Sequence, residues 1–350
     1  MSEQPTLKSV AAAAGVSTAA VSYAFNRPDR LSTRVREHIL AVARELGYPG
    51  PDAAARSLRT RRAGAIGVIF TVGLSYAFSD PYVLAMLSGL TEVTERTRTG
   101  LVLIPFDLTT TGLGEDEVRH SLDAVHRAVI DGAVADGLPD DHPAVLALAA
   151  RKIPLVRSSE TASGRCVVID DREAGREIGR HLAALGHRDV AMVVAYPEPP
   201  GVAVPVVDEA ALYPYSRLRL AGVREGLGPH ARVRVVSAGR NAQESGRVAA
   251  ASALGGPDVP SAVAADSDVL AAGVLDAVRL RGLEPGRDVS VTGFDDVPAA
   301  EPAGLTTIRQ PIRDRGRLMG RMLLDPGFTA RRVVLPAELV VRSSTGPAPR

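Results

Sequence analysis

The sequence predicts an all-α head followed by an α/β core of two doubly wound parallel-sheet subdomains, and three observations support this fold class. Short helical patterns separated by a glycine occupy the stretch from Thr6 to Asn26. From Ala65 onward, apolar runs of strand length alternate with helical patterns, which is typical of a parallel sheet covered by helices. The alternation runs through two series, and 350 residues are enough for such a core plus a small domain.

The first two helices are marked by their caps. Thr6 can cap a helix that ends at Gly15, and Ser17 can cap a second helix that reaches Asn26. The face of the second helix that can pack consists of Val21, Ala24 and Phe25. The opposite face consists of Thr18, Ala19, Ser22 and Tyr23. This pattern fits a helix-turn-helix whose second helix enters a DNA groove, and an ordinary helical hairpin would share it.

A third helix and a short linker complete the head. Ser32 can cap the third helix, which Gly47 ends. The small core expected between the three helices consists of Val10, Val21, Phe25, Ile39 and Leu46. Pro49 and Pro51 break the chain before a helical pattern over residues 53–60, which is far below the roughly 12–15 residues at which isolated helices become marginal. Its arginines suggest DNA as the stabilising partner, and a charged flexible linker would have the same composition.

The core is expected to contain two series of strands and helices. Strands of the first series are predicted at 65–70, 100–106 and 131–136, with helices at 82–97 and 115–129. Strands of the second series are predicted at 166–169, 189–194, 232–236, 261–265 and 288–293, with helices at 172–185, 216–226, 243–254 and 268–281. Residues 306–324 and 331–344 supply one more helix and a closing strand.

Charge separates the head from the core. Residues 1–62 carry ten Lys/Arg against five Asp/Glu, which leaves 31 against 35 in the remainder. A basic head suits nucleic-acid binding, because Lys and Arg near phosphates displace counterions. The single cysteine, Cys166, excludes a disulfide within one chain. No apolar segment follows the first polar residues and no run reaches the roughly 20 apolar residues of a membrane span, so we expect a cytoplasmic protein.

Two other classes of protein deserve comparison. An enzyme is not indicated, because the chain contains no G-x-S-x-G elbow, no Walker lysine motif and no histidine pair at zinc spacing. We therefore expect no catalytic residues, no metal and no cofactor. A solute-binding protein, or an enzyme-like α/β protein whose basic head does not read DNA, is the alternative. An exported solute-binding protein would share the core but would require a signal peptide.

Several segments, in this order, resemble the lactose-repressor (LacI/GalR) family of bacterial transcriptional regulators: TLKSVAAAAGVSTAAVSYAFN, ARELGYPGPDAAARSL, RLRLAG, DSDVLAAGV, VSVTGFDD and LTTIRQP. The resemblance covers almost the whole chain. It implies a homodimeric regulator, most simply a repressor, that binds a pseudo-palindromic operator in double-stranded DNA. It also implies that a small polar metabolite, such as a sugar or a related compound, is the effector.

The resemblance also implies boundaries. A helix-turn-helix domain would occupy residues 1–50, a hinge helix 51–62, and a core similar to periplasmic sugar-binding proteins 63–350. The N-subdomain would comprise about 63–161 and 297–325, and the C-subdomain about 162–296 and 326–344. Three crossovers would join them near residues 158–165, 294–298 and 324–330, and the effector would lie in the cleft between them.

The residues that would contact DNA follow from the same resemblance. Base edges would be read by Thr18, Ala19 and Tyr23, an apolar set in which the usual bidentate contact of arginine with guanine is unavailable. Leu58 matches the wedge leucine that enters the minor groove at the operator centre. The full expected set is Thr6, Ser17, Thr18, Ala19, Ser22, Tyr23, Asn26, Arg27, Ala55, Arg56 and Leu58.

The expected effector site combines resemblance with strand ends. Polar residues after parallel strands point toward the ligand crevice of α/β folds, and each of those chosen here has a family counterpart near the effector. Relatives that respond to sugars often place a stacking aromatic where this chain has Asn241. The full expected set is Phe78, Tyr82, Asp170, Arg219, Asn241, Asp268 and Asp295.

Three alternatives remain open at this stage. Asp170 and Asp171 are neighbours, so one of them can cap the following helix while the other faces the site. Arg219 can contact the effector or form a buried ion pair. The long segment 195–216 is either a lid that brings Tyr213 or Tyr215 into the site, or a surface excursion.

Overall fold

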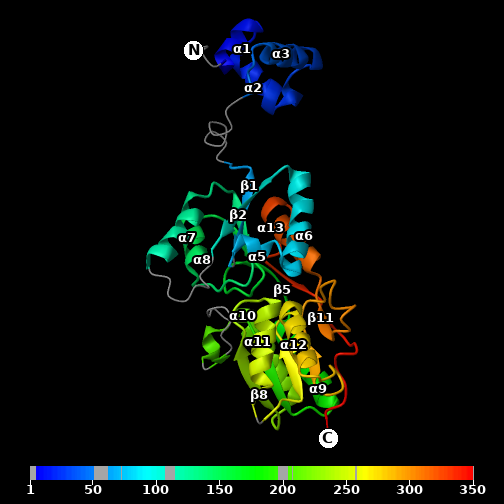
Figure 1. Cartoon of the computed structure of the whole chain (residues 1–350). Coiled ribbons are helices and arrows are strands. Elements are labelled where there is room, and N and C mark those ends of the chain that lie inside the picture. The colour runs from blue at the N-terminus through cyan, green and yellow to red at the C-terminus, as the bar shows by residue number, and fades with distance from the viewer. Residues whose placement is uncertain are drawn as a thin grey trace. The chain divides into compact units, whose positions relative to one another are not determined.

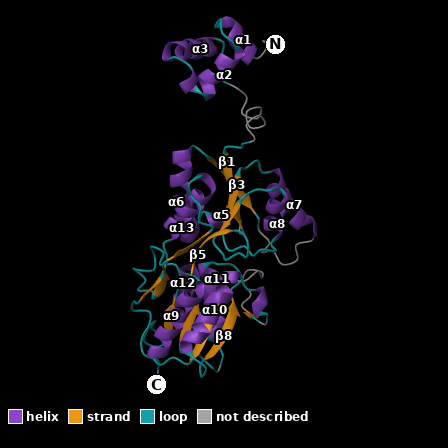
Figure 2. Ribbon diagram, turned by 180° about the vertical axis from the view of Figure 1, so that it is seen from behind, coloured by secondary structure: helices purple, strands orange, loops and turns teal. Residues whose placement is uncertain are grey.

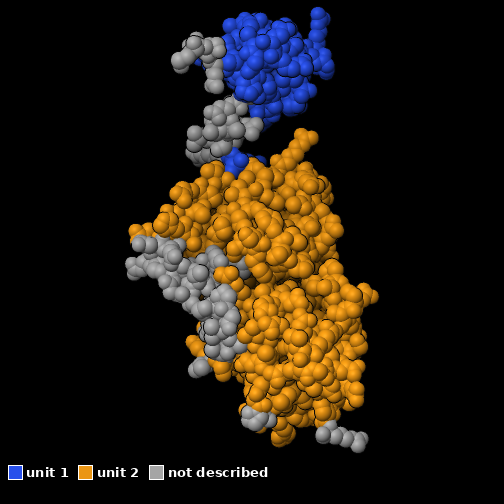
Figure 3. Space-filling model, viewed as in Figure 1, with its two compact units in different colours: residues 1–63 blue, residues 64–350 orange. Residues whose placement is uncertain are grey.

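The computed structural model describes residues 5–50, 62–71, 73–106, 115–195, 204–206, 208–256 and 258–349. The chain divides into two compact units, Met1–Ala63 and Gly64–Arg350 (Figure 3). The segment expected to form the hinge helix lies outside the described residues, except Arg62. No helix among the described residues has the length and apolar character needed to cross a membrane.

The head contains the predicted helices. They are α1 (Leu7–Ala13), α2 (Thr18–Asn26), the 3₁₀ turn η1 (Pro28–Arg30) and α3 (Thr33–Glu45). The Thr6 hydroxyl accepts from the Ser9 amide while the Ser9 hydroxyl accepts from the Thr6 amide, which closes a capping box. Ser17 caps α2, and Ser32 caps α3. Gly15 takes the left-handed conformation, with φ +64°, that separates α1 from α2.

Small side chains fill the centre of the head. The buried residues are Val10, Ala11, Ala14, Val21, Ala24, Ile39 and Ala43. Phe25 packs edge-on against Tyr48, with ring centroids 5.8 Å apart, and partly covers this core. The expectation that Leu46 belongs to the core is wrong: it is 41 % exposed. The physical reason is that Leu46 is the C-cap of α3, where the helix ends.

The described part of the second unit contains two large sheets, both flanked by helices, and a two-stranded ribbon (Figures 1 and 2). The first sheet has the order β12-β5-β4-β3-β1-β2, and the second has the order β10-β9-β6-β8-β7. Every neighbouring pair is parallel except β7 with β8. We call the first sheet with its helices the first subdomain, and the second sheet with its helices the second subdomain. The doubly wound architecture is therefore as predicted.

The first subdomain has α6 and α13 on one face of its sheet and α7 and α8 on the other (Figures 1 and 2). Its strands are β1 (Ala65–Phe70), β2 (Gly100–Pro105), β3 (Gly132–Ala135), β4 (Leu155–Arg157), β5 (Arg165–Ile169) and β12 (Arg332–Leu335). Its helices are α5 (Leu74–Ala77), α6 (Pro81–Thr97), α7 (Glu115–Arg127), α8 (Pro143–Ala150) and α13 (Ile312–Leu324).

The second subdomain has α9 and α10 on one face and α11 and α12 on the other. Its strands are β6 (Asp189–Val194), β7 (Val204–Pro205), β8 (Arg232–Ser237), β9 (Ala262–Ala265) and β10 (Ser290–Thr292). Its helices are α9 (Asp171–Ala184), the 3₁₀ turn η2 (Glu209–Ala211), α10 (Pro214–Leu227), α11 (Gln243–Ala253) and α12 (Asp268–Leu280). Strand β11 (Thr307–Arg309) pairs antiparallel with β13 (Glu338–Val340) in a separate ribbon.

The topology corrects several expectations. The strand at Arg165–Ile169 was expected to open the second series, but it pairs with β4 and β12 in the first sheet. The chain accordingly passes between the subdomains after β5, after β11 and after β12, about ten residues later than expected. An apolar strand sequence does not reveal which of two sheets it joins. Strand β4 and helix α8 were missed because β4 is short and α8 is apolar throughout, which hides its period.

Glycines let the paired helices approach closely. A Cβ atom at Gly222 of α10 would lie 2.0 Å from the Arg172 carbonyl oxygen of α9. A Cβ atom at Gly89 of α6 would lie 1.8 Å from the Arg313 carbonyl oxygen of α13. No other residue type fits at these contacts without moving a helix backbone. Each subdomain therefore has at least one tightly joined helix pair.

Candidate effector cavity and DNA-reading surface

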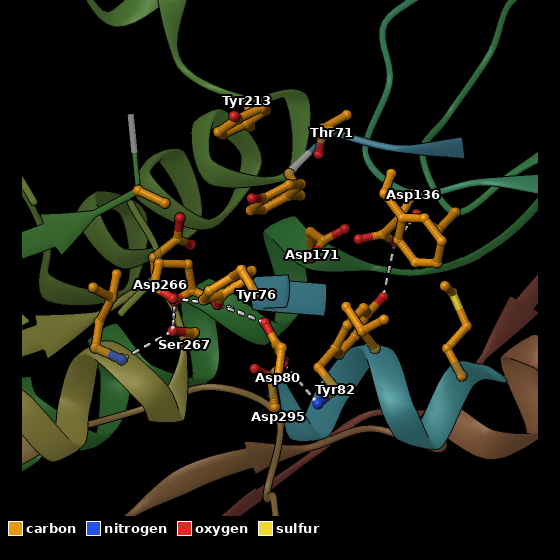
Figure 4. A pocket seen from close by; sticks show the side chains of 18 of the residues that line it. Thr71, Tyr76, Asp80, Tyr82, Asp136, Asp171, Tyr213, Asp266, Ser267 and Asp295 are labelled. Carbon is orange, nitrogen blue, oxygen red and sulfur yellow. Dashed lines mark hydrogen bonds between the residues drawn. The ribbon is translucent and has the colours of Figure 1, made fainter. Parts of the chain in front are cut away.

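A cavity of about 120 Å³ lies between the two subdomains (Figure 4). Most of its polar side chains follow strand ends, as expected for a crevice at the carboxyl edges of parallel strands. The first subdomain contributes Thr71, Tyr76, Asp80 and Tyr82 after β1, Asp136 after β3 and Ser158 after β4. The second contributes Asn241 after β8, and Asp266 and Ser267 after β9. Asp171 follows the passage of the chain between the subdomains after β5. Asp295 lies between β10 and β11, shortly before the next passage.

Arg219 of α10 is neutralised by two carboxylates. Its Nε donates to Oδ1 of Asp171 at 2.8 Å, and its Nη1 donates to the Asp266 carbonyl at 2.7 Å, with Oδ1 of Asp266 at 3.4 Å. The guanidinium lies over the Phe294 ring, 3.5 Å from its centroid, and only 7 % of the residue is exposed. Burial opposes the charged form, but Asp171 and Asp266 outweigh it and raise the pKa of Arg219. Arg219 is a paired wall residue, not an uncommitted donor.

The Tyr82 hydroxyl links a second arginine, Arg315 of α13, to Asp136 within the first subdomain. Its hydroxyl donates to Oδ1 of Asp136 at 3.0 Å and accepts from Nη1 of Arg315 at 2.6 Å. The Ser158 hydroxyl donates to the same Asp136 oxygen. Burial raises the pKa of the Tyr82 phenol, so the hydroxyl stays a donor at neutral pH. This chain of contacts fixes the Asp136 carboxylate at the cavity wall.

A group of hydrogen bonds bridges the cleft between the subdomains. It involves Tyr76, Asp80, Asn241 and Ser267. The Tyr76 hydroxyl donates to the Asn241 carbonyl and can instead donate to Oδ2 of Asp80 at 2.7 Å. The Asn241 amide donates to Asp80 at 3.3 Å, and the Ser267 hydroxyl donates to the Asn241 side-chain oxygen. Burial, followed by the nearby Asp80 carboxylate, raises the pKa of Tyr76. Direct hydrogen bonds between the two subdomains therefore border the cavity.

Asp295 is held at the cavity by its backbone as well as by its side chain. Its φ of +124° is strained for a residue with a Cβ atom, which is typical of functional positions. Gln310 donates to its Oδ1 at 2.6 Å. Burial, then the neighbouring Asp268, raises the pKa of the Asp295 carboxyl well above its ordinary value. This carboxyl is thus kept in an environment that disfavours its charge.

The head exposes the expected DNA-reading residues. Thr18, Ala19 and Tyr23 lie on the solvent side of α2, while Val21 and Ala24 of the same helix are buried. Residues expected to contact phosphates surround them: Thr6, Ser17 and Arg27 are exposed, and Ser22 and Asn26 are half-buried. The Asn26 amide donates to the Ser22 carbonyl at 3.0 Å. Ala55, Arg56 and Leu58 lie outside the described residues.

The chain matches two family models: bacterial regulatory proteins of the lacI family over residues 6–50, and the periplasmic binding protein-like domain over residues 180–345. An HTH-type transcriptional regulator of Mycolicibacterium smegmatis is 37 % identical, covering 98 % of this chain and 96 % of that protein. The chain belongs to the LacI family of bacterial transcriptional regulators. The HTH-type transcriptional regulator IpsA of Corynebacterium glutamicum is 34 % identical, covering 91 % of this chain and 90 % of that protein.

Solved structures of LacI-family proteins have the same fold. A LacI-family transcriptional regulator from Corynebacterium glutamicum matches with a TM-score of 0.72 at 27 % identity, covering 98 % of this chain and 99 % of that one. The CelR–cellobiose complex matches with a TM-score of 0.65 at 27 % identity, covering 97 % and 99 %. The family membership confirms the predicted resemblance. Members of this family are DNA-binding transcriptional regulators and not enzymes, and this chain is therefore a regulator of that kind.

Four of the residues expected to bind effector in this LacI-family regulator line the cavity: Tyr82, Arg219, Asn241 and Asp295. Three do not, and their expected placement is corrected. Phe78 is the C-cap of the short helix α5, where it is 54 % exposed and is not among the residues that line the cavity. Asp170 caps α9 through the Glu173 amide, which leaves its neighbour Asp171 to face the cavity. Asp268 lies behind the wall, where it accepts from the Thr307 hydroxyl and the Val297 amide.

Sequence reasoning missed other lining residues. Asp136 and Asp266 directly follow strands β3 and β9, so the strand-end rule that selected Asp295 could have selected them. Arg315 lies on α13, a helix remote in sequence, and no local pattern marks it. Tyr213 and Tyr215 both line the cavity and stack on each other, with centroids 5.5 Å apart. Both tyrosines that the lid alternative for segment 195–216 named therefore lie at the cavity, while residues 196–203 and 207 of that segment lie outside the described residues.

Proposed function

We propose that this LacI-family regulator is a ligand-responsive repressor that acts as a homodimer. Two heads related by a twofold axis would read two half-sites of a pseudo-palindromic operator. A small polar metabolite in the cavity would change the affinity for that operator. The observation that supports this proposal best is a cavity whose lining comes from both subdomains and includes carboxylate, hydroxyl and guanidinium groups.

The position of the cavity supports a regulatory role for its ligand. A ligand shifts a two-state equilibrium only through contacts that differ between the states. Residues on opposite walls, such as Asp136 and Asn241, change their separation when the subdomains move. A molecule that contacts both walls would therefore favour one arrangement of the subdomains.

The DNA-reading proposal concerns the head and the linker. Thr18, Ala19 and Tyr23 offer few donors for base edges, so we expect thymine methyl contacts and DNA shape to contribute to specificity. Replacing thymine with uracil at the matching positions should lower affinity.

Leu58 would wedge between base steps, so Leu58→Ala should reduce DNA bending and specific binding without affecting the core. Unchanged bending would contradict the wedge role.

The experiment begins with selection of bound duplexes from random DNA, followed by footprinting. We expect two half-sites in inverted orientation, and a single asymmetric site would contradict the homodimer.

Thermal-shift screening against sugars, nucleosides and other small polar compounds would then find ligands, and operator titration would measure their effect. Tyr82→Phe removes the donor to Asp136 and should weaken the ligand response while operator binding persists. Arg224→Ala, on the exposed side of α10, is the matched control.

A further inference from the structure

We infer that Arg315 makes the cavity select a compact ligand with a carboxylate or phosphate group, which would bind the Nε and Nη2 edge of this guanidinium. This inference rests on the proposed effector role of the same cavity, and it adds a residue that determines which ligands bind. Three observations lead to it: the burial of an arginine without a counterion, the donors that this arginine leaves unused, and the reduced negative charge of the surrounding wall.

Arg315 is a buried cation that forms no ion pair within the described residues. It lies on α13, and only 4 % of it is exposed. Its Nη1 donates to the Tyr82 hydroxyl at 2.6 Å, and its Cζ lies 6.0 Å from the centroid of the Tyr82 ring. Arg219, by contrast, contacts both Asp171 and Asp266. A guanidinium keeps its charge at neutral pH, and a buried charge is costly unless it is paired. Arg315 therefore lacks the counterion that its burial requires.

One edge of the Arg315 guanidinium is unused. Nε is buried and has no hydrogen-bond partner in the described part of the chain, and the hydrogen bonds found there leave Nη2 without an acceptor as well. The N–H groups of these two nitrogens point from the same edge of the guanidinium plane, and such an edge donates two parallel hydrogen bonds to a carboxylate or a phosphate. Because Arg315 is part of the cavity lining, a ligand in the cavity can supply the missing acceptors.

The cavity wall carries less negative charge than its carboxyl groups suggest. Burial raises the pKa of Asp80, Asp266 and Asp295 above their ordinary values. These carboxyl groups therefore oppose an anion less than fully ionised carboxylates would. An oxyanion beside Arg315 would in turn be strongly attracted, because opposite charges interact more strongly where water is excluded.

The space admits only a compact ligand. A volume of about 120 Å³ lies below the roughly 300–1,000 Å³ of typical ligand pockets. In so small a site, the group that binds Arg315 forms a large part of the ligand surface and therefore decides much of the specificity. Carboxylate and phosphate both present two oxygens that match the free edge, and experiment can distinguish them.

The first test measures the melting temperature of the full-length protein in sodium chloride, sodium acetate and sodium phosphate at pH 7 and equal ionic strength. Arg315→Met removes the charge, and Arg321→Met, in an exposed pair with Asp325 on the same helix, is the matched control. Acetate or phosphate should raise the melting temperatures of the wild-type and control proteins by about 2 °C or more beyond any rise in Arg315→Met. The anion with the larger difference is the preferred group. Equal rises in all three proteins would overturn the inference.

The second test separates the edge from the charge. Arg315→Lys keeps a cation but has no pair of parallel N–H groups, so its anion-dependent rise should be smaller than that of the wild-type protein. An undiminished rise in Arg315→Lys would contradict the assigned edge. In chloride alone, Arg315→Met should melt at a higher temperature than the wild-type protein, because it removes an unpaired buried cation. A lower melting temperature would show that the guanidinium is structural, and it would overturn the inference.

Operator titration distinguishes failure of this inference from failure of the proposed function. The probes are glucose, glucuronate and glucose 6-phosphate, added to the full-length protein with the compounds of the thermal-shift screen. An Arg315-dependent rise, together with an operator affinity that no compound changes, would contradict the effector role and support the anion site. A neutral compound that changes operator affinity, and whose acid and phosphate derivatives bind at least about tenfold more weakly, would contradict the anion site and support the effector role.

Discussion

The Tyr76 hydroxyl donates a hydrogen bond to the main-chain carbonyl of Asn241, which belongs to the other subdomain. The same hydroxyl lies 2.7 Å from Asp80, so its one proton is shared between a contact within its own subdomain and a contact across the cleft. These atoms border the cavity. Closure of the cleft is therefore partly supported by the protein alone, before any ligand contributes.

Tyr76→Phe should shift the ligand-free core toward wider separation of its subdomains, because it removes the hydroxyl that crosses the cleft. A hydrogen bond of this kind contributes about 0.5–1.5 kcal/mol. Spin labels at the exposed positions Glu95 and Arg180 would report the distance distribution, which should broaden toward longer values. Ser79→Ala removes a hydroxyl whose one hydrogen bond within the described residues goes to the Tyr76 carbonyl, and it should change nothing. Identical distributions in all three proteins would refute the bridge.

Arg219→Ala should destabilise the core by about 3–5 kcal/mol, because it leaves Asp171 and Asp266 buried without their cation. Arg224→Ala on the same helix breaks a pair with Glu209 in which both side chains are 42 % exposed, and should lose no more than about 1 kcal/mol. Urea denaturation measures both losses. Equal small losses would mean that Arg219 is not a buried ion-pair residue.

Gly222→Ala should destabilise the second subdomain by at least about 3 kcal/mol, the upper end of overpacking effects. The added methyl group would lie 2.0 Å from the Arg172 carbonyl oxygen and 2.7 Å from the Arg176 nitrogen, so α9 and α10 must separate. Gly256→Ala places its methyl group in open space and is the control. Thermal unfolding of the two variants decides the matter, and similar melting temperatures would contradict the close helix contact.

His142 should make stability depend on pH. Burial lowers the pKa of His142 to about 4, whereas an unfolded histidine titrates near 6.5. Its Nδ1 accepts from the Ala144 amide at 3.2 Å, so only the neutral ring caps α8. Because the folded-state pKa is depressed, the contribution is fully present above pH 6.5 and is lost as pH falls toward 4.

His142→Asn keeps a capping acceptor and does not titrate. The wild-type protein should therefore lose on the order of 1 kcal/mol relative to this variant between pH 7.5 and 4.5, a figure reduced for partial exposure of the ring. Urea unfolding at the two pH values measures the difference. A constant difference across this range would exclude His142 as the titrating group.

Ser17→Ala should affect DNA binding as well as head stability. Ser17 caps α2 and Ser32 caps α3, so loss of either hydroxyl should lower head stability by about 1 kcal/mol. Ser17 adjoins the α2 residues that we propose to read DNA, and its loss should also weaken DNA binding several-fold below the melting temperature. Ser32→Ala should bind DNA as the wild-type protein does. Equal DNA affinity of both variants would remove Ser17 from the DNA contacts.

Local sequence signals predicted much of the fold. Caps such as Ser17 and Ser32, and the turn glycine Gly15, act within a few residues, so helix starts in the head could be read directly. The alternation of strands and helices is also a local pattern, and it predicted the doubly wound core. The partner of a strand is a long-range property, which explains why β5 was placed in the wrong subdomain.

The candidate site was less predictable because its chemistry depends on pairs. Sequence could place Arg219 near the cleft but could not decide between effector and carboxylate partners, since Asp171 and Asp266 lie 48 and 47 residues away in the chain. The same limit applies to Arg315, which reaches Tyr82 from a helix 233 residues away. Strand-end position selects candidates, and only the fold shows which of two neighbours, such as Asp170 and Asp171, faces inward.

Strands β12 and β13 are consecutive in the chain yet belong to the first sheet and to the ribbon with β11, respectively. Deletion of residues 332–349 would thus remove pieces of two structural regions with one short segment. Such a deletion should destabilise both subdomains rather than a single one. The head is a separate compact unit formed by the contiguous stretch Met1–Ala63, so the shortened protein would still contain it intact.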